Sequence, residues 1–317
     1  MTVVAKTYHG LGTKIVLTVF TPATIKDLDN AYTLIKHYED LLTVNRAESE
    51  IMDINHAAGN HAVKVSPISY QLIKQAVEIS QKDLGFDVAI GPLVKLWHIG
   101  FSDAHVPAVK DIQARLKLID PRQIELNDTE RSVFLLHAGM ELDLGGIAKG
   151  YIADAIKQMW LNHGVNQGII NLGGNVVLLG PGPHQDQQWK VGIQDPFDVR
   201  NKPLGVLITK ACSVVTSGIY ERLLNYNGQK YHHIFDPKTG YPVNTNLASV
   251  TVISKKSITG EAWSSIGFYN GINTLKLSSI DDSLGFIFTT QQRQVFVTKN
   301  LREQFKIINN NYHFAQK

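Results

Sequence analysis

The sequence predicts an α+β fold in which helices flank a largely antiparallel sheet. Segments with apolar residues at helical spacing are concentrated in the first half of the chain, and short apolar runs typical of strands in the second half. This segregation favours α+β over a regular alternation of parallel strands and helices. The 317 residues contain no internal repeat, low-complexity tract or long linker. We therefore expect one domain over residues 1–317.

Four helices are predicted from apolar spacing and from start and stop signals. Ser66 followed by Pro67 is typical of an N-cap and a first helical position, and Gly85 is a stop signal for the same helix. The predicted helices span 27–43, 67–84, 111–119 and 151–163.

Nine strands are predicted from strict alternation or from short apolar runs between turn residues. The clearest alternation is Thr13-Lys14-Ile15-Val16-Leu17-Thr18-Val19-Phe20 near the start of the chain. The predicted strands span 13–20, 168–172, 175–179, 189–193, 204–209, 211–216, 248–253, 284–289 and 294–298.

Composition excludes several classes of function. Hydrophobic residues make up 44% of the chain, which is ordinary for a globular protein with a core. The net charge of +3 is small and spread out, so no nucleic-acid partner is expected. The single cysteine, Cys212, cannot form an internal disulfide, and its apolar surroundings predict a small buried side chain.

Targeting signals are not found in the sequence. No run of 18 apolar residues is present, so no membrane span is predicted. The first residues lack a charged segment followed by an apolar one, and no lipid-attachment cysteine follows. We therefore expect a cytoplasmic protein.

Two glycine pairs carry the strongest local signal. One lies in Asp143-Leu144-Gly145-Gly146-Ile147-Ala148-Lys149-Gly150-Tyr151 and the other in Asn171-Leu172-Gly173-Gly174-Asn175. Glycine permits positive φ and close approach, and free N–H groups at a turn or helix start bind phosphate well. Lys149 adds a positive charge, which favours a phosphorylated small molecule. The alternative is two ordinary turns, because neither segment is a dinucleotide fingerprint or a P-loop.

A second cluster of polar residues follows around position 233. His232 and His233 precede the Asp236-Pro237-Lys238-Thr239-Gly240 segment. A histidine here suits a general base near neutral pH. The alternative is a turn capped by a histidine. Two adjacent histidines on a strand would point to opposite faces, so one of them at most should face a pocket.

A third cluster is the pair Glu261 and Ser265. Their spacing of four residues places both oxygens on one face of a helix. A carboxylate and a hydroxyl together suit Mg²⁺, which prefers oxygen ligands and keeps waters or substrate phosphates. The alternative is an acidic residue that stabilises the start of a helix.

Taken together, these segments resemble the ApbE-type FAD:protein FMN transferases. The matches are colinear and cover nearly the whole chain. They lie at Gly12-Thr13, 49–55, Gly85-Phe86-Asp87, 91–97, 143–151 with Asp154, 171–175, Thr216-Ser217-Gly218, Tyr220-Glu221-Arg222, 233–240 and 261–265.

The resemblance implies a fold, a reaction and roles for residues. The fold is a single ApbE-like, T-fold-like α+β domain. The reaction is the Mg²⁺-dependent transfer of FMN from FAD to a Thr or Ser hydroxyl of an acceptor flavoprotein, with release of AMP. Glu261, Ser265 and the main-chain carbonyl of Ala148 match the metal ligands. His233 matches the base, and Asp236 would orient it. The positions implied to bind FAD are Leu11, Asn45, Gly85, Phe86, Asp87, Asp143, Lys149, Tyr151 and Ile234.

The chain departs from the family pattern at four positions. Glu261 replaces the usual Asp, and Ser265 replaces the usual Thr, which bears on metal affinity. Asn45 stands where many members have an aromatic residue that stacks on the flavin, and Ala89 replaces a common Thr. Two alternative functions follow: an Mg²⁺-dependent FAD pyrophosphatase that gives FMN and AMP, and a flavin-binding protein without turnover.

Overall fold

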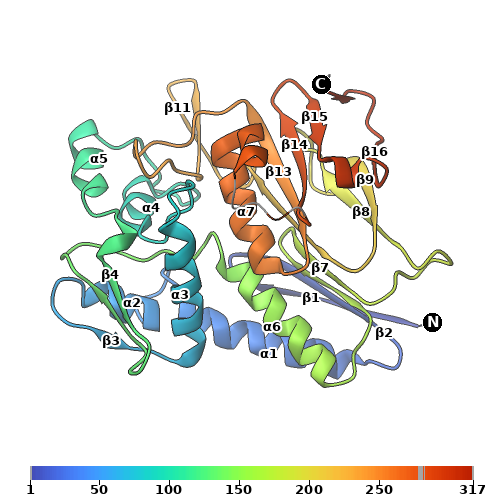
Figure 1. Cartoon of the computed structure of the whole chain (residues 1–317), viewed down its shortest axis with the longest axis horizontal. Coiled ribbons are helices and arrows are strands. Elements are labelled where there is room, and N and C mark those ends of the chain that lie inside the picture. Colours follow the sequence, from blue (N-terminus) through green and yellow to red (C-terminus); the bar gives the residue numbers. More distant parts are fainter. Residues whose placement is uncertain (1, 278–280, 282, 316–317) are drawn as a thin grey trace. The chain divides into compact units, whose positions relative to one another are not determined.

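The computed structural model describes residues 2–277, 281 and 283–315. Helices and strands combine in the predicted α+β fold, which is confirmed (Figure 1). The chain divides into two compact units, each assembled from separate segments. Unit 1 comprises Met1–Glu39, Lys149–Gly218 and Asn246–Lys317, and unit 2 comprises Asp40–Ala148 and Ile219–Thr245. That all of 1–317 forms one domain stays a prediction.

Unit 1 is built on a sheet in which nine of the described strands take part. The strand order is β1-β2-β6-β7-β10-β13-β14-β15-β17, and each neighbouring pair is antiparallel except β15 and β17. The bounds are β1 Val3–Gly10, β2 Thr13–Phe20, β6 Gly168–Leu172, β7 Asn175–Leu179, β10 Ser213–Gly218, β13 Leu247–Ser254, β14 Gly285–Thr290, β15 Gln294–Val297 and β17 His313–Phe314.

Each face of this sheet is covered by a different layer. Helices α1 (Ile25–Leu42), α6 (Ala148–Asn162) and α7 (Ser257–Asn270) lie on one face, where Val250 of β13 packs against Gly267 of α7. The opposite face packs on a three-stranded sheet of order β16-β9-β8, and Ile253 of β13 belongs to that core. The bounds are β8 Trp189–Gln194, β9 Pro203–Thr209 and β16 Phe305–Ile307. Alternate residues of β13 therefore serve two cores, and all eight are buried.

Unit 2 is richer in helices. Its three-stranded sheet has the order β3-β5-β4, and a separate hairpin joins β11 to β12. The helices are α2 Glu50–His56, α3 Pro67–Ser80, α4 Gly91–Trp97 and α5 Val109–Leu116. The strands are β3 Val63–Lys64, β4 Ile124–Asn127, β5 Ser132–Leu135, β11 Leu223–Tyr226 and β12 Gln229–His232.

The predicted elements agree with the structure to different degrees. The bounds of β2, β6 and β7 are those predicted, and Ser66 caps α3 by accepting the Ser69 N–H. Helix α3 ends at Ser80, four residues early, and Asp83, with a φ of 55°, prevents the helix from continuing to Leu84. Strand β10 is displaced by two residues from the predicted range. Short elements such as α2, α4 and β11 were not predicted.

Two further predictions concern the burial of the single cysteine and the presence of membrane-spanning helices. Cys212 was predicted to be buried and is half-buried, and burial raises the pKa of its thiol. None of the helices in the described part of the chain combines the length and the apolar character needed to cross a membrane.

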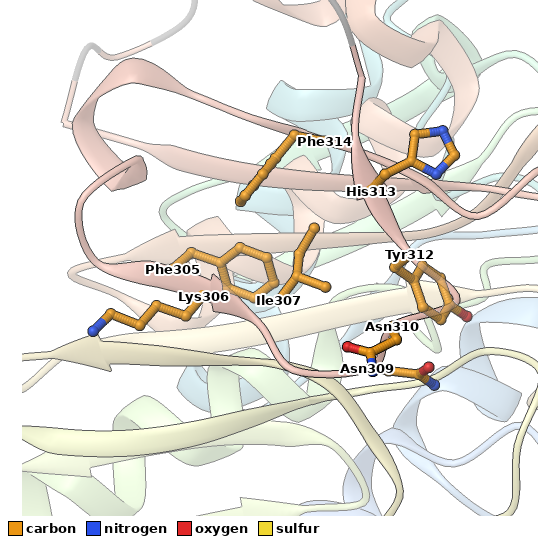
Figure 2. Close-up of a pocket in the computed structure, with 8 residues that line it drawn as sticks. All are labelled: Phe305, Lys306, Ile307, Asn309, Asn310, Tyr312, His313 and Phe314. Atoms are coloured by element: carbon orange, nitrogen blue, oxygen red, sulfur yellow. The ribbon is translucent and has the colours of Figure 1, made fainter.

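The C-terminal part of unit 1 forms an open pocket at the surface (Figure 2). It is lined by Phe305, Lys306, Ile307, Asn309, Asn310, Tyr312, His313 and Phe314. The buried Asp195 ties this segment down by accepting hydrogen bonds from the Tyr312 hydroxyl and from Asn309 Nδ2, the latter at 3.0 Å. None of the predicted site residues lines the pocket.

Candidate active site

The central feature of unit 1 is the buried carboxylate of Glu261 on α7, which is 3% exposed. Its Oε1 lies 2.6 Å from Lys149 Nζ. Its Oε2 accepts hydrogen bonds from the Gly150 N–H and, at 3.4 Å, from Asn175 Nδ2. A buried charge is costly unless it is paired and hydrogen-bonded, and this one has both kinds of partner.

The first turn of α6 supplies two of these partners because it passes very close to α7. A Cβ on Gly150 would lie 2.6 Å from the carbonyl oxygen of Ser257, so glycine is needed here for close approach. The helix begins at Ala148, three residues before the predicted start at Tyr151. The free N–H groups of this motif were expected to face phosphate, but the Gly150 N–H is taken by Glu261. The positive end of the α6 dipole stabilises the negative charge of Glu261.

The second glycine pair forms a tight turn between β6 and β7. Gly173 and Gly174 have φ values of +66° and +99°. The Gly174 N–H donates to Asn171 Oδ1 at 2.9 Å, and a Cβ on Gly173 would overlap the side chain of Thr13. These observations account for both glycines by backbone conformation and space. A ligand at this turn stays a prediction.

Asp154 on α6 caps the first turn of α7. Its Oδ1 accepts the Ser257 N–H at 2.8 Å, and its Oδ2 accepts the Ile258 N–H at 3.0 Å. Burial raises the pKa of Asp154, and the two N–H donors oppose that shift. The cap fixes the helix that carries Glu261 and, one turn later, the half-buried Ser265.

Two predicted flavin contacts, Leu11 and Tyr151, belong to unit 1. Leu11 lies in the two-residue turn between β1 and β2 with a φ of 54°, a conformation that is rare outside glycine. Its N–H donates to Glu39 Oε1 at 2.6 Å. Tyr151 is half-buried, burial raises the pKa of its phenol, and its ring centroid lies 5.8 Å from that of Tyr38.

In unit 2 the two adjacent histidines differ in backbone and contacts. His232 is the last residue of β12, whereas His233 lies in the bend that follows. His232 is 9% exposed, its Nε2 lies 3.1 Å from the Val243 carbonyl, and its Nδ1 accepts the Ile234 N–H at 3.2 Å. Burial lowers the pKa of His232. Its ring is therefore neutral, with the proton on Nε2, and both nitrogens serve the loop. His233 is half-buried.

The loop after the histidines has a defined shape. Asp236 Oδ1 accepts the Lys238 N–H at 2.8 Å, and the Gly240 N–H donates to the Asp236 carbonyl at 2.9 Å. Trp97 supports the loop, because its Nε1 donates to the Gly240 carbonyl at 2.9 Å and its ring lies against Phe235. The predicted turn is confirmed, whereas the role of Asp236 toward His233 stays a prediction.

The remaining predicted positions also belong to unit 2. The turn at Gly85 has a φ of +97°, and burial, opposed by the Ala89 N–H, raises the pKa of Asp87 to about 6. Asp143 donates its N–H to the Val88 carbonyl at 2.9 Å, which joins two predicted segments.

The other predicted positions of unit 2 differ in how far their side chains are exposed to solvent. Phe86 is buried, Ile234 is half-buried and Asn45 is exposed. Ala148 is the first residue of α6.

Several supporting residues were missed as functional because sequence spacing does not reveal them. Asn175, Ser257 and Asp154 make hydrogen bonds to partners that lie 82 to 104 positions away in the sequence. One signal was present, since a polar residue directly after a glycine pair begins the otherwise apolar strand β7. A buried polar side chain in such a place needs a hydrogen-bond partner.

Comparisons with known proteins place the chain among relatives of one family. A model of the ApbE family matches residues 11–283. An FAD:protein FMN transferase of Klebsiella pneumoniae (strain 342) is 46% identical over 89% of this chain and 87% of its own length. A protein of the same description from Treponema pallidum (strain Nichols) is 38% identical over 77% of this chain and 71% of its own length. The crystal structure of the ApbE protein of Thermotoga maritima matches with a TM-score of 0.87 and 27% identity, over 96% of this chain and 99% of that one.

Proposed function

We propose that this chain, which belongs to the ApbE family, transfers FMN from FAD to a Thr or Ser hydroxyl of an acceptor flavoprotein and releases AMP. The resemblance predicted from the sequence is confirmed, and so is the prediction of an enzyme of the flavin-transfer class. The observation that carries the detailed proposal is the buried Glu261 carboxylate with Lys149 and the Gly150 N–H at the start of α6.

We propose Mg²⁺ as the resident metal. Glu261 and Ser265 supply a carboxylate and a hydroxyl from one helix, which are oxygen donors that suit a hard divalent cation, and the family resemblance adds the Ala148 carbonyl. In the described part of the chain, no three His, Cys, Asp or Glu side chains gather where they could hold a metal, so the set depends on this mixture of carboxylate, hydroxyl and carbonyl. When bound, the ion would neutralise and orient pyrophosphate oxygens. Lys149 carries a second positive charge for the phosphates.

His233 is proposed as the general base. A hydroxyl is a weak nucleophile at neutral pH and needs a nearby base. In the proposed step, the acceptor oxygen bonds to the phosphorus on the FMN side, the bond from that phosphorus to the AMP phosphate oxygen breaks, and the hydroxyl proton moves to His233. His232 is less suited, because both of its ring nitrogens already have partners.

The decisive experiment is incubation of the protein with FAD and Mg²⁺, with and without a candidate flavoprotein. Mass spectrometry would detect FMN added to the acceptor, and chromatography would detect AMP. FMN adduct and AMP in equal amounts support the proposal. Rapid AMP release without an adduct would instead establish the FAD pyrophosphatase, which the non-aromatic, exposed Asn45 favours. Tight FAD binding with no AMP would establish a flavin-binding protein.

A further inference from the structure

The two oxygens of Glu261 are held by donors of different kinds. Oε2 accepts from the main chain at Gly150 and from the amide of Asn175, which is 2% exposed. Oε1 faces the ammonium of Lys149, whose side chain is 30% exposed. Main-chain and buried amide donors are fixed in place, whereas a partly exposed lysine side chain can move. Oε1 is therefore the oxygen that can exchange its partner.

The orientation of the Asn175 amide follows from the chemistry of its neighbours. Its Oδ1 lies 2.6 Å from the Ser257 hydroxyl, and its Nδ2 lies 3.4 Å from Glu261 Oε2. An ionised carboxylate only accepts hydrogen bonds, so the amide must turn its NH₂ toward Glu261. The amide oxygen then faces Ser257, and the hydroxyl of Ser257 must donate to it.

Asn175 thereby bridges two positions on one face of α7. Ser257 and Glu261 are four residues apart, which places them one above the other on the helix. Ser257 is fully buried, and its own N–H is held by Asp154 at 2.8 Å. Ser257 is thus held at the start of the helix, and Asn175 connects it to the Glu261 carboxylate.

We infer that Asn175 is a positioning residue, which holds Oε2 of Glu261 so that Oε1 is presented to the divalent cation. Ser257 acts through Asn175 by fixing its amide. The inference rests on the proposed function, because it assigns a role toward the metal that the proposed reaction needs. Groups that orient metal ligands without touching the metal commonly change metal affinity by about 10–100-fold.

The test uses binding of Mn²⁺, which prefers the same oxygen ligands as Mg²⁺ and whose free ion gives an EPR signal. Asn175→Leu keeps the branched shape and removes the amide, and it should weaken Mn²⁺ binding by about 10–100-fold. Ser257→Ala removes only the hydroxyl and should weaken binding by a smaller factor. The double variant should bind as weakly as Asn175→Leu alone, since one residue acts through the other.

The control is Asn309→Leu, which removes a similar bond from an asparagine to a buried carboxylate of unit 1, Asp195 (Figure 2). It should leave Mn²⁺ affinity unchanged. If it weakens binding as much as Asn175→Leu, the effect is general destabilisation and the inference fails. Circular dichroism establishes that each variant is folded, and if Asn175→Leu does not fold, Ser257→Ala with unchanged affinity overturns the inference.

The outcomes for the wild-type protein separate the two proposals. If the wild-type protein binds no Mn²⁺, with or without FAD, the metal in the proposed function and the inference about Asn175 are both wrong. A wild-type protein that binds Mn²⁺ while both variants bind equally well leaves the proposed function standing and overturns the inference alone. Additive effects of the two substitutions also overturn it.

Discussion

The Glu261 cluster of unit 1 and the loop from His232 to Gly240 of unit 2 hold their polar groups by different means. Glu261 is buried and receives donors from α6 and β7 while it belongs to α7. The loop is shaped by its own turn, in which Asp236 accepts the Lys238 N–H, and it is supported from outside by Trp97. The first region depends on tertiary packing, and the second depends largely on local hydrogen bonds.

This difference matches the work proposed for each region. An ionised carboxylate in a core needs fixed donors, because an unpaired buried charge is very costly. A general base must instead reach a proton on an incoming hydroxyl, so a half-buried residue in a loop suits the task. Substitutions in the Glu261 cluster should therefore change both the free energy of unfolding and metal binding. Substitutions in the loop should change the rate of transfer and the free energy of unfolding by different amounts.

The largest expected effect comes from Glu261→Gln, which keeps the shape and removes the charge. A metal supplies several kcal/mol of transition-state stabilisation, so transfer of FMN should fall by at least about 10³-fold. Breaking a buried ion pair should also lower the free energy of unfolding by about 3 kcal/mol. The measurements are FMN transfer by mass spectrometry and unfolding in urea.

A matched control for Glu261→Gln is available in the same unit. Asp195 is 2% exposed and accepts hydrogen bonds from the Tyr312 hydroxyl and Asn309 Nδ2. Asp195→Asn should lower stability while leaving transfer per folded molecule unchanged. If Asp195→Asn lost transfer as severely as Glu261→Gln, burial of a charge rather than metal binding would explain both.

The second prediction separates the two histidines. His233→Ala should lower the rate of transfer by about 10²–10⁴-fold, the usual cost of losing a general base. FAD binding, followed by flavin fluorescence, should persist. His232→Ala should lower the rate much less, and it should lower the free energy of unfolding by about 1–3 kcal/mol, because it leaves buried groups without a partner. A reversed order of the two rates, or loss of FAD binding in His233→Ala, would place the base elsewhere.

The third prediction tests the support of the loop. Trp97→Phe removes the hydrogen bond from Nε1 to the Gly240 carbonyl, worth about 1 kcal/mol, so transfer should fall by less than about tenfold. Trp189→Phe is the control, because Trp189 Nε1 makes an equivalent bond of 2.9 Å to the Gly180 carbonyl in unit 1. That variant should lose similar stability with no change in transfer. Equal effects of both variants on transfer would show that Trp97 has no particular role in the loop.

The sequence predicted the local part of this arrangement well. Strands β2, β6 and β7 begin and end where alternation and turn residues placed them, and Glu261 and Ser265 share α7 as their spacing requires. These features depend on residues that are close in the sequence, where periodicity and capping apply.

What the sequence did not predict depends on contacts between distant segments. Gly150 approaches Ser257, which is more than a hundred residues away in the sequence, and its N–H donates to the Glu261 carboxylate. Asn175 joins α7 in the same way. The alternation expected across the two histidines also fails for a physical reason, because β12 ends at His232 and the backbone bends at the next residue.

The smallest expected effect concerns pH and the buried His232. Burial lowers the pKa of His232 below its ordinary 6.5, so at lower pH the unfolded chain takes up a proton that the folded ring does not. Stability contributed by the neutral ring is therefore present above the unfolded pKa and is lost as pH falls below about 6.5.

The measurement that checks this is urea unfolding of the wild type and of His232→Asn between about pH 5.5 and 7.5. The advantage of the wild type should shrink toward low pH by at most about 1.4 kcal/mol per pH unit, the limit for one proton. Contributions that the two proteins share cancel in the difference. An advantage that grows toward low pH would mean that the folded ring is charged, and the contrast drawn between the two histidines would then be wrong.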